Sequence, residues 1–336
     1  MSASRFNDHA VLDVVGIGNA IVDVLVQTDD TFLNDHGLQK GGMALIDEQQ
    51  AETLYQASGP GQETSGGSVA NTMVGIAQLG GRTGFIGRVR DDQLGSIFSH
   101  DIQAVGTRFE TPAATSGATT ARCLIYVTPD AERTMCTFLG ASTQLEPDDL
   151  DLSMVKQTKM LYLEGYLWDS PAAKRAFVAG AEACRAAGGQ VALSLSDGFC
   201  VDRHRDSFLE LVHGHVDVLF ANEVEIKSLY QTDDFDTALE HVRGRCSVIA
   251  ITRSDQGSVV LSSDQRWDVG IFSLGDLVDT TGAGDLYAGG FLQAYTQGES
   301  LERCGQLGAL CAGQIVTQLG ARSQVCLKEL ASTHLN

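Results

Sequence analysis

Seven consecutive residues carry the strongest chemical signal in this chain. Residues 279–285 read Asp-Thr-Thr-Gly-Ala-Gly-Asp, and the small residues that follow predict a helix over Asp285–Tyr295. Glycines let the backbone turn tightly and approach a ligand closely. The first amides of a helix are unpaired and carry the positive end of its dipole, so they suit a phosphate or a developing oxyanion. Beside them Asp285 can accept a proton from a substrate hydroxyl, which phosphoryl transfer requires.

A second glycine-rich string lies far upstream. Residues 66–72 read Gly-Gly-Ser-Val-Ala-Asn-Thr and open a predicted helix over Ser68–Leu79. The two strings, in this order, resemble the N-terminal and C-terminal signatures of the ribokinase/PfkB family of sugar and nucleoside kinases. The resemblance implies a base, a set of charge-stabilising backbone groups and a set of substrate contacts. These are Asp285 as the base, Gly282, Ala283 and Gly284 for charge, and Gly66, Gly67 and Asn71 for substrate hydroxyls.

Two shorter strings would serve the nucleotide. Asn222-Glu223-Val224-Glu225 follows a predicted strand and by itself indicates only a helix N-cap box. It resembles the family motif that organises magnesium and phosphate, so the resemblance implies that Asn222 binds cofactor and that Glu225 acts on Mg²⁺ indirectly, through water. Residues 252–257 resemble the nucleotide-binding turn, with Thr252 and Gly257 as contacts, although Ser254 stands where glycine is usual.

The implied cofactors are ATP and Mg²⁺. The resemblance also leaves a monovalent cation such as K⁺ open, near the loop of residues 279–281.

The choice of acceptor rests on residues outside these strings. Residues 16–23 read Gly-Ile-Gly-Asn-Ala-Ile-Val-Asp and resemble the adenosine kinase-like members, in which Asn19 and Asp23 would contact ribose. They also half-match a dinucleotide fingerprint, but Ile21 occupies the third glycine position and a strand follows where a helix is required.

Three further side chains complete the predicted acceptor site. Tyr166 and Phe199 follow two predicted core strands, where aromatic rings could stack on a purine; the alternative is that they are plain packing residues. Arg133 lies at a predicted hairpin turn and is a candidate clamp for the transferred phosphate. An arginine at such a turn is otherwise simply solvated.

The elements that must position these residues alternate between strand and helix. Short β-branched runs predict core strands, and the segments between them have helical periodicity. This alternation predicts an α/β fold with a central, mainly parallel sheet and helices on both faces, and the resemblance makes it ribokinase-like. The predicted core strands cover residues 12–17, 83–86, 160–163, 191–195, 216–220, 248–252 and 258–261.

Some segments break the alternation. Residues 22–26 have strand character, and residues 119–128 and 132–139 flank a Pro-Asp turn. We expect them to pair as a small antiparallel sheet that forms a lid, although two ordinary surface hairpins would show the same pattern. The whole chain, residues 1–336, is predicted to be a single kinase domain with a discontinuous lid at approximately 22–46 and 112–139.

Composition excludes several classes of protein. The net charge of −20, with Arg and Lys scattered singly, argues against nucleic-acid or anionic-membrane partners. Eight cysteines without a Cys-x-x-Cys pair predict buried free thiols. No signal peptide or membrane-length apolar run is found, so a cytoplasmic protein is expected. A monomer and a homodimer both remain open.

The sequence therefore predicts ATP-dependent phosphorylation of the 5′-hydroxyl of a purine nucleoside, adenosine to AMP, with Asp285 as general base. The first alternative is a sugar kinase acting on fructose, ribose or a related sugar. The second is a catalytically silent, ligand-binding regulator, which the intact Asp285 disfavours.

Overall fold

A nine-stranded sheet forms the centre of the part of the chain that the computed structural model describes, residues 10–130 and 132–335. The strand order is β14-β13-β12-β11-β10-β9-β1-β5-β6, and all neighbours are parallel except at β13 and β14, which pair antiparallel. The strands are β1 (Leu12–Ile17), β5 (Thr83–Ile86), β6 (Arg108–Phe109), β9 (Thr158–Glu164), β10 (Gln190–Ser194), β11 (Val218–Asn222), β12 (Val248–Thr252), β13 (Ser258–Leu261) and β14 (Arg266–Val269).

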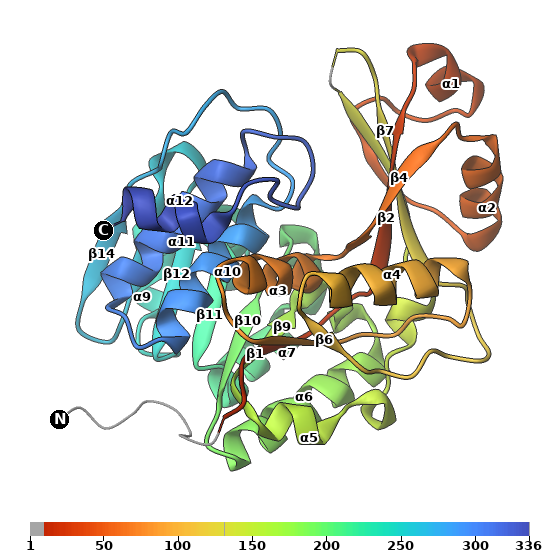
Figure 1. The fold of residues 1–336 in the computed structure, drawn as a ribbon. Helices are drawn as coiled ribbons and strands as arrows, with labels where there is room; N and C mark the ends of the chain where they lie inside the picture. The colour runs from red at the N-terminus through yellow and green to blue at the C-terminus, as the bar shows by residue number, and fades with distance from the viewer. Residues whose placement is uncertain (1–9, 131, 336) are drawn as a thin grey trace.

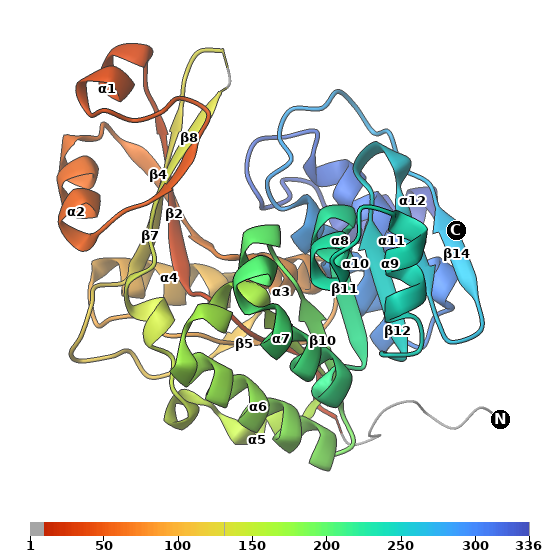
Figure 2. The same cartoon turned by 180° about the vertical axis from the view of Figure 1, so that it is seen from behind.

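Both faces of this sheet are buried, which explains why its strands read as continuous apolar runs. Neighbouring residues of one strand point to opposite faces: Val15 and Ile17 of β1 pack into one core cluster, whereas Val14 packs into another. Helices α5 to α9 cover the first face (Figure 2), and helices α3, α4, α10 and α11 cover the second (Figure 1). The predicted ribokinase-like arrangement of a mainly parallel sheet between helices is confirmed.

The helices and 3-10 turns have the following bounds. The α-helices are α1 (Asp30–Asp35), α2 (Glu48–Ala57), α3 (Ser68–Gln78), α4 (Gln93–Ala104), α5 (Leu152–Lys156), α6 (Pro171–Ala186), α7 (Gly198–His215), α8 (Glu223–Tyr230), α9 (Phe235–Val242), α10 (Ala283–Thr296), α11 (Leu301–Ile315) and α12 (Leu327–His334). The 3-10 turns are η1 (Gly140–Gln144), η2 (Pro147–Asp149), η3 (Gly165–Asp169) and η4 (Ser254–Gln256).

A smaller sheet projects from the core (Figure 1). Its strand order is β3-β8-β7-β2-β4, and α1 and α2 lie beside it. The strands are β2 (Ile21–Gln27), β3 (Met43–Leu45), β4 (Gly61–Gly66), β7 (Ala121–Val127) and β8 (Arg133–Phe138).

The smaller sheet differs in two respects from the predicted antiparallel lid. The β7–β8 hairpin is antiparallel as expected, but β2 pairs with β7 in parallel, as does β3 with β8. Between β2 and β7 the chain runs back through the core, so the two strands enter the sheet from the same side. Strand β4 also belongs to this sheet although it lies outside both predicted lid ranges.

The cysteines behave as predicted, because all eight are free thiols and all except Cys326 are buried. None of the helices in residues 10–130 and 132–335 has the length and apolar character that a membrane crossing requires.

Candidate active site

Four of the predicted site residues lie at one edge of the large sheet. Strands β9, β10, β11 and β12 are parallel neighbours, so their carboxyl ends lie in a row. Tyr166 follows β9, Phe199 follows β10, Asn222 ends β11 and Thr252 ends β12, with the last two directly paired. In open α/β sheets this edge is where ligands bind.

Asp285 lies in the first turn of α10, facing the first turns of α3. Its Oδ1 accepts a hydrogen bond from Ser68 Oγ at 2.6 Å, and its Oδ2 accepts one from Asn71 Nδ2 at 3.0 Å. Thr72 Oγ1 donates to the backbone oxygen of Asp285 at 3.1 Å. Burial raises the pKa of Asp285 above its usual range, while these donors oppose that rise. The carboxylate is therefore held in one orientation and is more basic than a solvated aspartate.

The start of α10 offers unpaired amides beside this carboxylate. Gly282 is the N-cap of α10 and has a left-handed φ of 79°. A larger residue would not fit there, because an added Cβ would lie 2.7 Å from the Cβ of Ala321. The amides of Ala283 and Leu286 bond to Thr280 and Gly282, respectively. Within the described residues no hydrogen bond uses the amides of Gly284 and Asp285, so they can receive an anion.

The glycine pair at 66–67 forms the tight turn from β4 into α3. Gly67 has a φ of 100°, and a Cβ there would lie 2.2 Å from the backbone oxygen of Asn19, so only glycine fits. At Gly66 a Cβ would lie 2.3 Å from Asp23 Oδ2, which places the Asp23 carboxylate against this turn. Burial raises the pKa of Asp23 to about 6; Arg322 and Arg133 oppose the rise, and Asp285 adds to it. Asp23 and Asp285 therefore share one electrostatic environment.

Arg133 occupies a buried position at the start of β8 and bridges the smaller sheet to the 279–285 string. Its Nη1 lies 2.7 Å from Asp279 Oδ2 and donates to Thr281 Oγ1 at 3.3 Å. The side chain is only 8% exposed, yet its Nε and Nη2 are buried without a partner in the described part of the chain. Buried guanidinium donors without partners are costly, so these two nitrogens are suited to an anionic ligand.

Asn19, the predicted ribose contact, has hydrogen-bond partners inside the protein. Its side chain is 3% exposed, and its Nδ2 donates to Glu164 Oε1 at 2.5 Å while its Oδ1 accepts from Ser142 Oγ at 2.8 Å. Both polar atoms are thus used inside the protein. Asn19 thereby links the ends of β1 and β9, and its contact with ribose stays a prediction.

The two predicted aromatic residues are exposed at the sheet edge. Phe199, in the first turn of α7, is 77% exposed, and Tyr166, in η3, is 44% exposed. Ser196, which lies between β10 and α7, has a left-handed φ of 70°. Its Oγ accepts a hydrogen bond from the amide of Gly165 at 2.9 Å. A non-glycine residue held at positive φ is strained, and such strain is common near functional sites. The alternative that the two rings are packing residues is not supported.

The residues predicted to bind the nucleotide form a helix capping box, at Asn222 and Glu225, and a turn between β12 and β13. Asn222 caps α8, and its amide and Nδ2 donate to Glu225 Oε2 and Oε1 at 2.9 and 2.6 Å. Glu225 is 5% exposed, and burial raises its pKa to about 7. Gly257 closes the β12–β13 turn at a φ of 80°. Ser254, where the family usually has glycine, has a φ of 51°, so the departure falls on a position that favours glycine.

Two residues of the site region were not singled out from sequence. Glu164 is fully buried at the end of β9 and accepts from Asn19 and from the amide of Val69 at 3.0 Å; burial raises its pKa to about 7. Arg322 donates to Ser65 at the end of β4 and to Ala70 in the first turn of α3. The partners of both residues lie about a hundred residues or more away along the chain, so no local pattern predicts these contacts. For Glu164 the signal in the sequence is a carboxylate at the end of the apolar run of β9.

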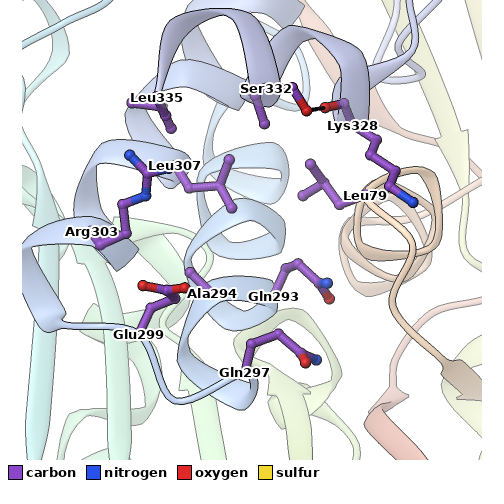
Figure 3. Close-up of a pocket in the computed structure, with 11 residues that line it drawn as sticks. Leu79, Gln293, Ala294, Gln297, Glu299, Arg303, Leu307, Lys328, Ser332 and Leu335 are labelled. Carbon is purple, nitrogen blue, oxygen red and sulfur yellow. Dashed lines mark hydrogen bonds between the residues drawn. The ribbon is translucent and has the colours of Figure 1, made fainter.

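A cavity of about 220 Å³ lies elsewhere, between α10, α11 and α12 (Figure 3). Gln293, Arg303 and Lys328 line it, and none of the predicted site residues does. Gln293 stands eight residues beyond Asp285 on α10, which is about 12 Å along a helix. This cavity is separate from the site described above.

The family description that matches residues 43–328 is pfkB family carbohydrate kinase. The chain belongs to the pfkB family. A solved structure of adenosine kinase from Sinorhizobium meliloti matches with a TM-score of 0.88 and 50% identity, covering 96% of this chain and 99% of that chain. A probable sugar kinase from Rhizobium etli CFN 42 matches with a TM-score of 0.89 and 47% identity, covering 96% of this chain and 98% of that one.

Sugar kinases also appear among the relatives matched by sequence. The 5-dehydro-2-deoxygluconokinase of Geobacillus thermodenitrificans is 27% identical, covering 94% of this chain and 91% of its own length. This pfkB kinase is therefore an ATP-dependent phosphotransferase with an alcohol acceptor, as the two glycine-rich strings predicted. The names of its relatives divide between nucleoside and sugar acceptors.

Proposed function

We propose that this pfkB kinase transfers the γ-phosphate of ATP to the 5′-hydroxyl of a purine nucleoside and converts adenosine to AMP. The observation that carries the proposal is the 50% identity, over nearly the whole of both chains, to the Sinorhizobium meliloti adenosine kinase. Asp23 beside the Gly66 turn and the exposed rings of Tyr166 and Phe199 support it, because a nucleoside has both vicinal hydroxyls and a planar base.

Asp285 is proposed as the general base. The 5′-oxygen attacks the γ-phosphorus, its proton passes to the Asp285 carboxylate, and the bond from the γ-phosphorus to the bridging oxygen breaks to release ADP. Ser68 and Asn71 hold the carboxylate in place for this transfer. Of the three predicted residues of this turn, Gly282 and Gly284 have amides without a hydrogen-bond partner in the described residues, whereas the amide of Ala283 is bonded to Thr280. The amides of Gly282 and Gly284, with that of Asp285, are proposed to stabilise the charge of the transferring group, since they are fixed before the reaction.

Arg133 is proposed to bind the transferred phosphate through Nε and Nη2, the two donors without protein partners. Asp23, with Gly66, Gly67 and Asn71, is proposed to hold the acceptor hydroxyls. The smaller sheet, predicted as residues of about 22–46 and 112–139 and joined by β4, is proposed to act as a lid that excludes water during transfer. The chain as a whole is proposed to be one kinase domain.

Asn222, Glu225, Thr252 and Gly257 are proposed to lie at the ATP site. Mg²⁺, when bound with ATP, offsets the negative charge of the phosphates. Both Glu225 oxygens already accept from Asn222, which fits an indirect role through water. No cluster of three or more His, Cys, Asp or Glu suited to a metal occurs in the described residues, which fits a metal held mainly by phosphate. K⁺ near residues 279–281 would rely on backbone carbonyls, because Thr281, Gly320 and Arg133 occupy the Asp279 carboxylate.

A sugar kinase is the second candidate function. It is favoured by the 47% identical probable sugar kinase from Rhizobium etli, which matches the fold as closely. A sugar would use the same base and the same hydroxyl contacts but would leave the two exposed rings without a role.

The experiment that tests the proposed function is identification of the product. The purified protein, incubated with ATP, Mg²⁺ and adenosine, should yield AMP and ADP in equal amounts by chromatography and mass. 5′-Deoxyadenosine, which lacks the reacting hydroxyl, should not be consumed. ADP formation that is independent of adenosine but requires a sugar would reject the nucleoside assignment and retain the kinase.

A further inference from the structure

Arg322 is the side chain that ties the substrate turn to the C-terminal part of the chain. It stands in the loop between α11 and α12. Its Nε donates to the backbone oxygen of Ser65 at 3.1 Å, its Nη2 to Ser65 Oγ at 2.9 Å, and its Nη1 to the backbone oxygen of Ala70 at 3.4 Å. The amide and hydroxyl of Ser65 in turn donate to Asp101 Oδ2 at 2.8 and 2.6 Å.

These contacts bracket the residues proposed to hold the acceptor. Ser65 immediately precedes Gly66 and Gly67, and Ala70 immediately precedes Asn71. One planar guanidinium therefore fixes both the entry and the exit of the turn from β4 into α3. A planar fork can do this with several simultaneous bonds, which a lysine ammonium cannot reproduce.

Arg322 also supplies positive charge where two carboxylates meet. Asp285 adds to the rise in the pKa of Asp23, so the two groups repel each other, and Arg322 opposes the rise at both. The titratable and charged groups that face this pair are Cys123, which is paired with Asp23 across β2 and β7, and Arg133, Tyr162, Glu164, Tyr166 and Arg322.

The two cations of this group are not equivalent. Arg133 forms a direct ion pair with Asp279 at 2.7 Å, which neutralises much of its field. Arg322 forms no ion pair with any carboxylate in residues 10–130 and 132–335, because its hydrogen bonds go to uncharged oxygens. Its charge is therefore felt by the neighbouring carboxylates, including Asp101 behind Ser65.

We propose that Arg322 is a positioning residue of the phosphoryl-transfer site. It aligns the hydroxyl-binding turn through Ser65 and Ala70, and its charge lets Asp23 and Asp285 act as carboxylates together. The proposal rests on Asp285 being the base, as proposed above, but not on which alcohol is the acceptor.

The test compares Arg322→Met, Arg322→Lys and the control Arg303→Met, which removes an arginine of α11 at the remote cavity. Arg322→Met should raise the acceptor KM about tenfold with little change in the KM for ATP. It should also move the acid limb of kcat/KM to higher pH by about one unit, because the carboxylates lose a cation. Arg322→Lys should restore the acid limb but not the acceptor KM, which separates charge from geometry. Arg303→Met should match the wild type in both.

Ser65→Ala provides an independent test if Arg322→Met does not fold. It removes one bond to Arg322 and one to Asp101 but no charge. It should raise the acceptor KM while leaving the acid limb in place. An unchanged acid limb in Arg322→Met, or a uniform loss of kcat and folding stability without a change in KM or pH profile, overturns the proposal. Failure of the wild type to use adenosine would instead reject only the nucleoside assignment, since the same profiles can be measured with its preferred alcohol.

Discussion

Two halves of the candidate site are built differently: the acceptor half, around Asp285 and the Gly66–Gly67 turn, and the purine half, formed by Tyr166 and Phe199. In the acceptor half, Asp285 is held by two side-chain donors at 2.6 and 3.0 Å, and the neighbouring turn is fixed by Gly67 and Arg322. In the purine half, Phe199 and Tyr166 are 77% and 44% exposed. The groups proposed to perform chemistry are thus preorganised, whereas those proposed to recognise a purine are presented on the surface. Preorganised groups lose more when changed, so mutations in the two halves should differ in size.

The largest expected effect is at Asp285, the proposed general base. Asp285→Asn preserves the shape and the bond from Ser68 but cannot accept the proton, so kcat should fall about 10²–10⁴-fold. Binding of ATP, measured by calorimetry without acceptor, should be unchanged. A variant with wild-type kcat would show that this preorganised carboxylate is not the base.

Asp23→Ala should have the next largest effect. Two hydroxyls would lose one charged acceptor, so the acceptor KM should rise about 100-fold. The KM for ATP should stay within about twofold, because the residues proposed to bind ATP lie at the ends of β11 and β12 and in the segments that follow these strands. The isosteric Asp23→Asn keeps one acceptor oxygen and should lose less. Equal acceptor KM values in all three proteins would place Asp23 outside the acceptor half.

Arg133→Ala should lower kcat by about 10- to 100-fold, since charge-assisted bonds to the transferring phosphate are lost. Lys40→Ala is a matched control, because Lys40 is an exposed cation on the same projecting unit, and among the described residues its only ion pairs are with Asp30 and Asp130. The control should retain wild-type kcat in the same assay. If Arg133→Ala changed melting temperature but not kcat, Arg133 would be only a structural link to Asp279.

The smallest effects are expected in the purine half. Phe199→Ala and Tyr166→Ala should each raise the adenosine KM about two- to tenfold, since one aromatic contact is worth about 0.5–1.5 kcal/mol. Phe199→Tyr, which keeps the ring, should behave as wild type. Losses as large as that of Asp23→Ala would erase the contrast between the two halves, and no change at all would remove these rings from the site.

Sequence was most informative where chemistry and secondary structure depend on a local string. The starts of α3, α8 and α10 follow from the residues that turn or cap the chain there, and the observed starts differ by two residues at most. The strand ends that carry Tyr166, Phe199, Asn222 and Thr252 follow from the βαβ alternation, which places parallel strand ends at one edge.

Sequence was least informative where a side chain has distant partners. The side chain of Asn19 bonds to Glu164 and Ser142, which lie 145 and 123 positions away along the chain, and no local pattern predicted these partners. Arg322 and Ser65 are separated by 257 positions. The mixed pairing of the smaller sheet likewise depends on where the chain re-enters, which periodicity cannot encode.

The central claim is tested most directly by kcat/KM for adenosine, ribose and fructose, measured with one preparation at saturating ATP and Mg²⁺. The exposed rings can contact a purine but have nothing to stack on in a free sugar, so adenosine should have the highest value, exceeding both sugars by at least about 100-fold. A higher value for ribose or fructose would contradict the nucleoside assignment and identify this protein as a sugar kinase with the same base.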